Sequence, residues 1–230
     1  MTFVDHFAGN ASDSDDNDIP TQFNPSAEFH VHEGPRDIGL VFVGDSLVAG
    51  YGDPKGLGWV SRVVGRTSHP DVDVTAYNLG VRGDSTADLL HRWVAESQPR
   101  WRARGEKRLV IGVGTNDVQS GMTTARLRLN LANVLDDAAA AGIATFVVGP
   151  PPTLDPDFNR RLEVVVEAQS DVCSRRGVPF VDCYHPLLGH DQWQSDLNAG
   201  DGVDPGQAGY GLIAWLVLHG GWEQWLQLQS

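Results

Sequence analysis

The chain has little of what marks a membrane, nucleic-acid-binding or disulfide-bonded protein. No run approaches 18 consecutive apolar residues, so no membrane-spanning helix and no stable membrane insertion are expected. Lys and Arg number 17 against 30 Asp and Glu, giving a formal net charge of −13. Because phosphate binding requires clustered cations, this charge argues against nucleic acid or an anionic membrane surface as a partner.

The first residues and the cysteines give a prediction of location. Residues 1–18 have neither the basic start nor the apolar segment of a signal peptide. Two cysteines in 230 residues, Cys173 and Cys183, are too few for a disulfide framework and are interpreted as apolar filler. The sequence therefore predicts a cytoplasmic protein.

Composition divides the chain into two parts. Residues 1–36 are rich in Asn, Ser, Asp and Pro, and low hydrophobicity with dense like charge predicts a disordered acidic tail. Metal binding by its aspartates is the alternative, but the turn glycine and closing Glu of a calcium loop are missing, so no metal is expected. Residues 37–230 are expected to form one domain.

Apolar runs alternate with helical patterns from residue 37 onward. This alternation predicts an α/β fold in which helices cover both faces of a five-stranded parallel sheet. The predicted strands span 38–43, 72–78, 108–113, 143–148 and 178–182. The predicted helices span 58–67, 86–97, 123–141, 156–176 and 207–227, and Leu127, Leu131, Val134 and Leu135 define the buried face of the third.

Polar residues follow the predicted strands at points that a parallel sheet brings to one edge. Together they supply a hydroxyl, a glycine amide, a carboxamide and a carboxylate, which are the components needed for acyl transfer. Taken singly, each has a structural interpretation as a turn glycine, a helix cap or a loop carboxylate. The segments are Gly44–Leu47, Asn78–Gly83, Gly112–Asp117 and Asp201–Pro205.

These four segments, in this order and spacing, resemble the SGNH hydrolase superfamily, also called GDSL esterases and lipases. The resemblance runs from about Ile38 to the last helix and implies a flavodoxin-like three-layer α/β/α sandwich. It further implies hydrolysis of small-molecule carboxylic esters or thioesters without a cofactor. By motif, Ser46 matches the nucleophile, whose own N–H joins Gly80 N–H and the Asn116 side chain in the oxyanion hole. Asp201 matches the acidic member of the catalytic triad.

The last segment departs from the family pattern at one position. The family has Asp-x-x-His-Pro, whereas this chain has Asp201-Gly-Val-Asp204-Pro. An aspartate is a poorer proton acceptor than imidazole near neutral pH, so an intact site with much reduced hydrolysis is expected, with Asp204 as a weak base. Two interpretations stay open: the base has been replaced, or the chain is an engineered variant of an active esterase. His185 or His190 could substitute as base, although a surface or loop role is the simpler interpretation of both.

Neighbouring apolar residues give weak indications about substrate and assembly. Candidates for the substrate pocket, equally compatible with the core, are Leu47, Val81, Val118, Leu154 and Val203. Tryptophans in the final predicted helix are interpreted as core or as a homodimer contact; they are Trp215, Trp222 and Trp225.

Two other functions compete with the esterase prediction. A ligand-binding or regulatory protein would keep the pocket without the chemistry. A flavodoxin-like nucleotide binder would share the fold class, but the chain has no evident phosphate-cradling loop.

Overall fold

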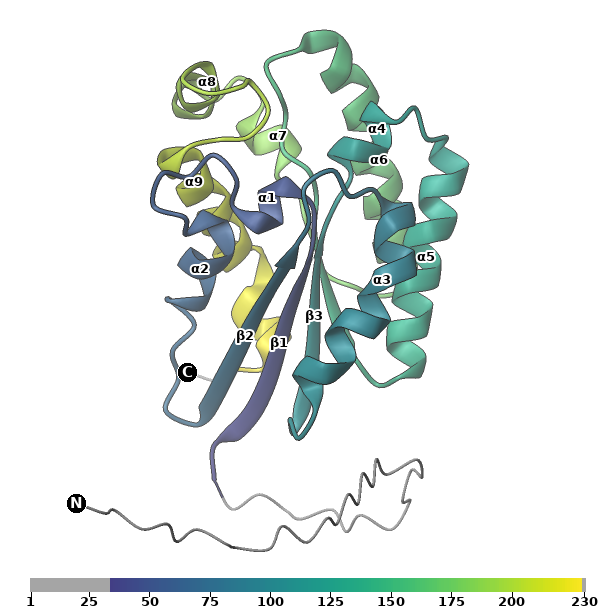
Figure 1. The fold of residues 1–230 in the computed structure, drawn as a ribbon, viewed down its shortest axis with the longest axis vertical. Coiled ribbons are helices and arrows are strands. Elements are labelled where there is room, and N and C mark those ends of the chain that lie inside the picture. The colour runs from purple at the N-terminus through teal and green to yellow at the C-terminus, as the bar shows by residue number, and fades with distance from the viewer. Residues whose placement is uncertain (1–33, 229–230) are drawn as a thin grey trace, which may run out of the picture. The chain divides into compact units, whose positions relative to one another are not determined.

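Five parallel strands form a single sheet in the computed structural model, which describes residues 34–228 (Figure 1). The predicted acidic tail, apart from its last residues, lies outside the described residues, and the first strand begins at Arg36. In spatial order β2-β1-β3-β4-β5, the strands are β1 (Arg36–Gly44), β2 (Val72–Gly80), β3 (Glu106–Gly112), β4 (Ala144–Val148) and β5 (Phe180–Val181).

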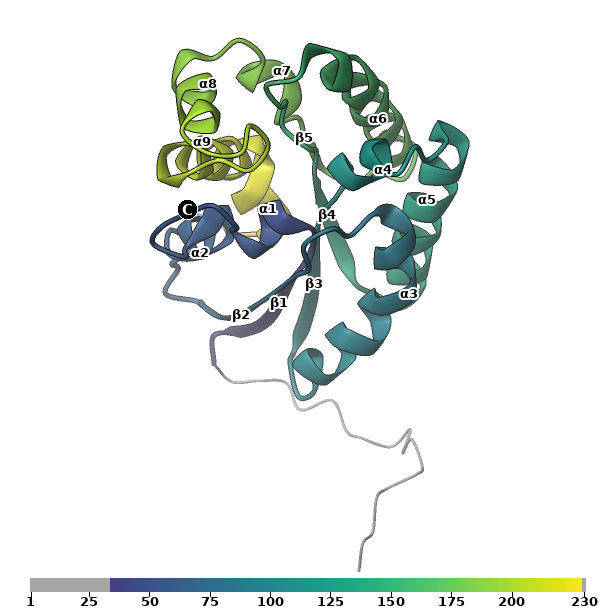
Figure 2. The same cartoon turned by 45° about the horizontal axis from the view of Figure 1, so that its top comes forward.

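Helices cover both faces of the sheet (Figure 2). One face carries α3 (Thr86–Ser97), α5 (Thr124–Ala140) and α6 (Pro156–Ser174); the other carries α2 (Gly58–Val64), α9 (Gln207–Val217) and α10 (Glu223–Leu226). Short helices lie beyond the carboxyl ends of the strands: α1 (Ser46–Ala49), α4 (Thr115–Gln119), α7 (Tyr184–Leu187) and α8 (Asp191–Asn198). The predicted α/β sandwich with a five-stranded parallel sheet is confirmed.

Strand β1 shows why the core has two halves. Side chains alternate across a strand, so Leu40 and Phe42 face the layer of α2 and α9, whereas Val41 and Val43 face the layer of α3 and α5. All four are fully buried. A central strand covered on both faces therefore appears in the sequence as a continuous apolar run.

The last predicted helix, 207–227, is wrong in its extent. Helix α9 ends at Val217, and a π-helical turn, η2 (Leu218–Trp222), separates it from α10. Gly220 and Gly221 have non-helical backbone angles and break the helix.

The kink in this final segment gives its tryptophans different environments. Trp222 and Trp225 pack in the core against Phe146, whereas Trp215 is 54% exposed. The core interpretation thus holds for two of the three.

Element boundaries elsewhere follow the prediction closely. Helix α3 has the predicted bounds, and the predicted face of α5 is buried. Strand β5 is shorter than predicted, with two residues. No helix within residues 34–228 is long and apolar enough to cross a membrane.

Candidate active site

Three glycines lie side by side where β1, β2 and β3 end. Gly44 of β1 is in register with Gly80 on one side and with Gly112 on the other. A Cβ on Gly44 would lie 2.0 Å from the Gly112 carbonyl oxygen, and one on Gly80 would lie 2.2 Å from the Ala49 nitrogen. Helix α1 therefore packs directly on the ends of three strands because side chains are missing there.

Ser46 opens helix α1 at the point where the strand order reverses. β1 is flanked by β2 and β3, and in open α/β sheets this switch point is where ligands bind. Asp45 caps the helix, since its carboxylate accepts a hydrogen bond from the Leu47 N–H at 3.0 Å. Ser46 itself is half-buried, with its side chain at the sheet edge where the prediction places the nucleophile.

Asp45 is fully buried and carries an unusual proton affinity. Burial raises the pKa of Asp45 to about 8, opposed by the Leu47 hydrogen bond and reinforced by nearby carboxylates, that of Asp204 first. The second carboxyl oxygen of Asp45 has no hydrogen-bond partner among the described residues. Asp45 thus caps the Ser46 turn through one oxygen of its carboxyl group.

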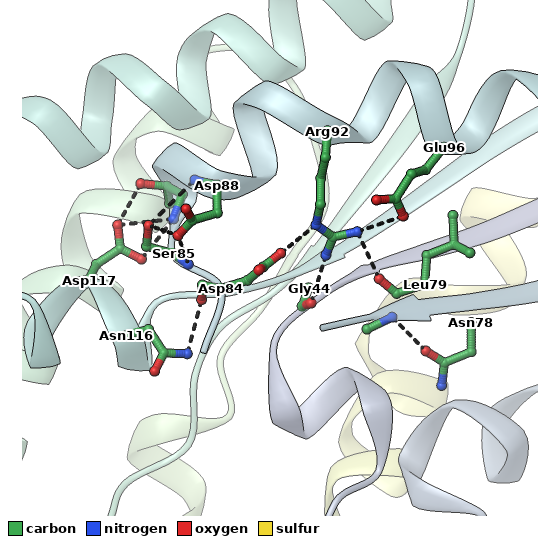
Figure 3. A network of polar contacts seen from close by, with 12 residues as sticks. Gly44, Asn78, Leu79, Asp84, Ser85, Asp88, Arg92, Glu96, Asn116 and Asp117 are labelled. Atoms are coloured by element: carbon green, nitrogen blue, oxygen red, sulfur yellow. Dashed lines mark hydrogen bonds and ion pairs between the residues drawn. The ribbon is translucent and has the colours of Figure 1, made fainter. Parts of the chain in front are cut away.

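Asn116 reaches across to the loop that follows β2. Its side-chain Nδ2 donates to the Asp84 carbonyl at 3.0 Å, which brings helix α4 against the segment 81–85 (Figure 3). Asp117, the next residue, accepts from both the backbone N–H and the hydroxyl of Thr86 at the start of α3. This carboxylate, buried to 1% exposure, fixes α4 to α3 and was not singled out by the sequence analysis.

Replacing Asp117 with alanine is expected to lower the free energy of unfolding by about 2–4 kcal/mol, because the buried N–H and hydroxyl of Thr86 would lose their acceptor. Urea unfolding measures the change. Asp157→Ala is the control, since this exposed carboxylate pairs only with Arg160 and its loss should cost no more than about 0.5 kcal/mol. Equal losses in the two variants would contradict the role given to Asp117.

The two glycines of the loop after β2 differ in their surroundings. The Gly80 N–H donates to the Asn78 side-chain oxygen at 3.0 Å, so in this structure it is already hydrogen-bonded (Figure 3). The Gly83 N–H has no acceptor in the described part of the chain, and Gly83 adopts φ +91° directly before the Asp84 carbonyl that binds Asn116. The assignment of Gly80 as an oxyanion donor stays a prediction, and Gly83 is a second candidate that sequence reasoning treated only as a turn residue.

The side chain of Ser46 acts on the buried carboxylate of Asp204. Burial raises the pKa of Asp204 above the ordinary carboxyl value, and the charge of Asp201 adds to this increase. The interaction with the Ser46 side chain and the charge of Arg82 both lower the pKa, by less than burial raises it. Asp204 is 9% exposed, and its Oδ1 has no partner among residues 34–228. The assignment of Asp204 as the base beside Ser46 stays a prediction.

Asp201 holds the loop that carries Asp204. Its Oδ1 accepts hydrogen bonds from the backbone N–H groups of Val203 at 2.9 Å and Asp204 at 2.8 Å. Within the described residues its other oxygen has no hydrogen-bond partner. The carboxylate therefore shapes the turn and keeps one oxygen available.

Neither candidate substitute histidine lies free to act on Ser46. His185 bonds Asp182 through Nδ1 at 2.6 Å and faces Glu163, and its hydrogen bond to Asp182 raises the pKa of the ring. His190 accepts from the Trp193 N–H as the cap of α8. In the described chain no hydrogen bond joins either ring to Ser46 or Asp204.

Two cavities flank the Asp201–Asp204 loop. A cavity of about 400 Å³ is lined by Leu154 and Val203 together with Thr115 and Phe158. A second, of about 520 Å³, is lined by Asp204, Tyr51 and neighbouring polar residues. The Asp201–Asp204 loop thus contributes to the walls of both cavities.

The five predicted pocket residues do not act as one group. Leu154 and Val203 line the smaller of the two cavities. Leu47 and Val118 are buried in the core, and Val81 is 43% exposed. The alternative interpretation as core residues therefore fits Leu47 and Val118.

Comparison with known proteins shows the family. A profile of the GDSL-like lipase/acylhydrolase family matches residues 42–212, and the chain belongs to this family, within the SGNH hydrolase superfamily. It is 30% identical over 174 residues to "Esterase TesA" of Pseudomonas aeruginosa, covering 74% of this chain and 80% of that protein.

Solved structures agree with this assignment. The crystal structure of TesA has a TM-score of 0.65 at 25% identity, covering 79% of this chain and 97% of that one. An acetylxylan esterase from Geobacillus stearothermophilus, Axe2, shares the fold with a TM-score of 0.67 at 20% identity, covering 85% and 99% of the two chains. The chain is thus an esterase- or lipase-type hydrolase by family.

Proposed function

We propose that this protein hydrolyses small carboxylic esters or thioesters through Ser46, at a rate much reduced by Asp204. The observation that carries the proposal is the interaction of the Ser46 side chain with the buried Asp204 carboxylate, which lowers the pKa of Asp204. Ser46 would attack the acyl carbonyl, while Asp204 accepts its proton and returns it to the leaving group. Asn116 Nδ2, the Ser46 N–H and a glycine N–H from the loop after β2 would stabilise the oxyanion.

The cavity beside the Asp201–Asp204 loop supports an assignment of the acyl subsite. We assign the acyl group to the cavity lined by Leu154 and Val203, because it offers apolar side chains beside a polar site. We also place the protein in the cytoplasm, a proposal supported by Cys173 and Cys183, which are both free and buried.

Covalent labelling of Ser46 tests the proposal directly. A fluorophosphonate should modify Ser46 in the chain as it stands, slowly, and Ser46→Ala should abolish the modification. Mass spectrometry of the labelled peptide identifies the residue. Labelling at the rate of the Ser46→Ala control would contradict an active serine.

The pH dependence of hydrolysis is a second expected result. Asp204 acts as base only when ionised, and because its pKa is raised above the ordinary 3.8, hydrolysis should rise with pH through a step above that value. In Asp204→His the step should move towards the imidazole pKa of about 6.5. The pH profiles of kcat/KM for p-nitrophenyl butyrate measure the step in the parent and in Asp204→His. If the step falls at the same pH in both proteins, it arises from the titration of a group other than residue 204.

A ligand-binding protein without chemistry is the second candidate function. The replacement of the triad histidine, with both cavities beside it retained, favours this alternative. It predicts thermal stabilisation by short-chain esters with neither turnover nor covalent labelling of Ser46.

A further inference from the structure

Arg92 links three of the four loops that carry the candidate catalytic groups, two directly and the third through Asp84. From helix α3 its Nη2 donates to the Gly44 carbonyl at 3.0 Å, directly before Asp45 and Ser46 (Figure 3). Its Nη1 donates to the Leu79 carbonyl at 3.0 Å, at the end of β2. Its Nε donates to the Asp84 carboxylate at 2.5 Å.

The third loop is reached through Asp84. The side chain of this residue accepts from Arg92, and its backbone carbonyl accepts from Asn116 Nδ2 at 3.0 Å. A continuous chain of hydrogen bonds therefore runs from the residue before the Ser46 turn, through one guanidinium, to the carboxamide of α4 (Figure 3).

Only an arginine can make this set of contacts. The guanidinium is planar and carries five N–H donors in a fixed arrangement, so it holds several acceptors in defined directions. Its side chain is 16% exposed, and the Asp84 side chain is 9% exposed, so the contact is shielded from water. Glu96, one turn further along α3 and 38% exposed, accepts another hydrogen bond from Arg92 Nη1. A lysine would keep the charge but would lose the geometry.

We propose that Arg92 is a positioning residue that sets the relative placement of Ser46, the glycine loop after β2, and Asn116. It does not touch the substrate, and it acts by fixing the carbonyl groups of Gly44 and Leu79 and the carboxylate of Asp84. The catalytic part of this inference rests on the proposed function of Ser46. The geometric part, two loops held by one side chain and a third joined to them through Asp84, does not.

Two substitutions test the inference, with a matched control. Arg92→Lys retains the charge, and Arg92→Gln removes it. The control is Arg176→Lys, because Arg176, in the turn after α6, donates two hydrogen bonds to Asp136 of α5, on elements other than the Ser46 loop. The Glu96→Gln variant removes the exposed ion pair and leaves the contacts to the carbonyl groups.

Amide hydrogen exchange of the full chain gives the readout that is independent of activity. In both Arg92 variants, peptides covering residues 44–50, 79–85 and 114–119 should exchange faster, while those of α5 and α6 should not change. In Arg176→Lys and Glu96→Gln these three segments should exchange as in the parent. Unchanged exchange at the three segments in Arg92→Gln would overturn the inference.

Kinetics measured in the Asp204→His background test the catalytic part. Arg92→Lys should lower kcat for p-nitrophenyl butyrate and the rate of fluorophosphonate labelling by about 10²-fold, with KM close to that of the parent, because a displacement of about 1 Å between reacting groups has that effect. A loss explained by unfolding would appear as a lowered Tm and raised exchange throughout, and would count against positioning. If Asp204→His itself shows no hydrolysis, the proposed function fails, and the exchange experiment alone decides the role of Arg92.

Discussion

Replacing Asp204 with histidine is expected to raise kcat for p-nitrophenyl butyrate by about 10²-fold or more. Imidazole near its ordinary pKa both accepts the serine proton and returns it to the leaving group, whereas a carboxylate is the weaker base and accepts the proton poorly. The contribution of a well-placed general base spans about 10² to 10⁴ in rate.

The structure provides for the larger side chain. Asp204 lines the cavity of about 520 Å³, so the ring can extend into existing space. Asp201 keeps one oxygen without a partner in the described structure, and it could accept the N–H of the new imidazole and fix its tautomer.

Two controls separate this gain from other effects. Asp204→Asn has nearly the size of the parent side chain but is no base, and should hydrolyse no faster than the parent. Ser46→Ala combined with Asp204→His should abolish the gain, since the new base would have no nucleophile. If Asp204→His hydrolyses the ester as slowly as the parent, residue 204 does not occupy the position of the general base.

Replacing Gly80 with alanine is expected to lower the free energy of unfolding by about 3 kcal/mol or more. The new methyl group would lie 2.2 Å from the Ala49 nitrogen and 2.7 Å from its Cα, both backbone atoms that cannot rotate away. For a domain of this size, such a loss lowers Tm by roughly 6–12 °C. Calorimetry or urea unfolding measures it.

Gly83→Ala is the matched control, three residues along the same loop. A Cβ there meets nothing within 4 Å, so only the backbone conformation, φ +91°, is unfavourable. This strain costs about 1–3 kcal/mol, less than the clash at Gly80. A larger loss in Gly83→Ala than in Gly80→Ala would contradict the packing role of Gly80 under α1.

Much of the sheet and its long helices could be predicted from the sequence, because their signals are local. The buried run at residues 38–43 and the periodic face of residues 127–135 follow from side-chain alternation and helical periodicity. The short helices α1, α4, α7 and α8 span too few residues to show a period, and the prediction contained none of them. The break at Gly220 and Gly221 overrides a strongly apolar pattern in the final helix.

The site was predictable where a motif marks it and not where partners are distant in sequence. The motif order of the family marks Ser46, Asn116 and Asp204 in the sequence. Parallel topology then predicts that they lie at one edge of the sheet. Arg92 and Asp117 have no such mark. Gly44 lies 48 residues from Arg92 and Thr86 lies 31 residues from Asp117, so these contacts become visible only in the folded chain. The pairing of the Gly80 N–H with Asn78 likewise depends on a side-chain orientation that residue order does not specify.

The protonation state of Asp45 affects the negative charge that would form on the substrate when Ser46 attacks it. Asp45, directly before the serine, is acted on by the charges of three other buried aspartates: Asp84, Asp117 and Asp204. If all were ionised, a negative tetrahedral oxygen on Ser46 would form against their combined repulsion. Because the pKa of Asp45, the nearest in sequence, is about 8, this group is mostly neutral at pH 7. Acylation of Ser46 would therefore become harder in alkaline solution, where Asp45 gains its charge.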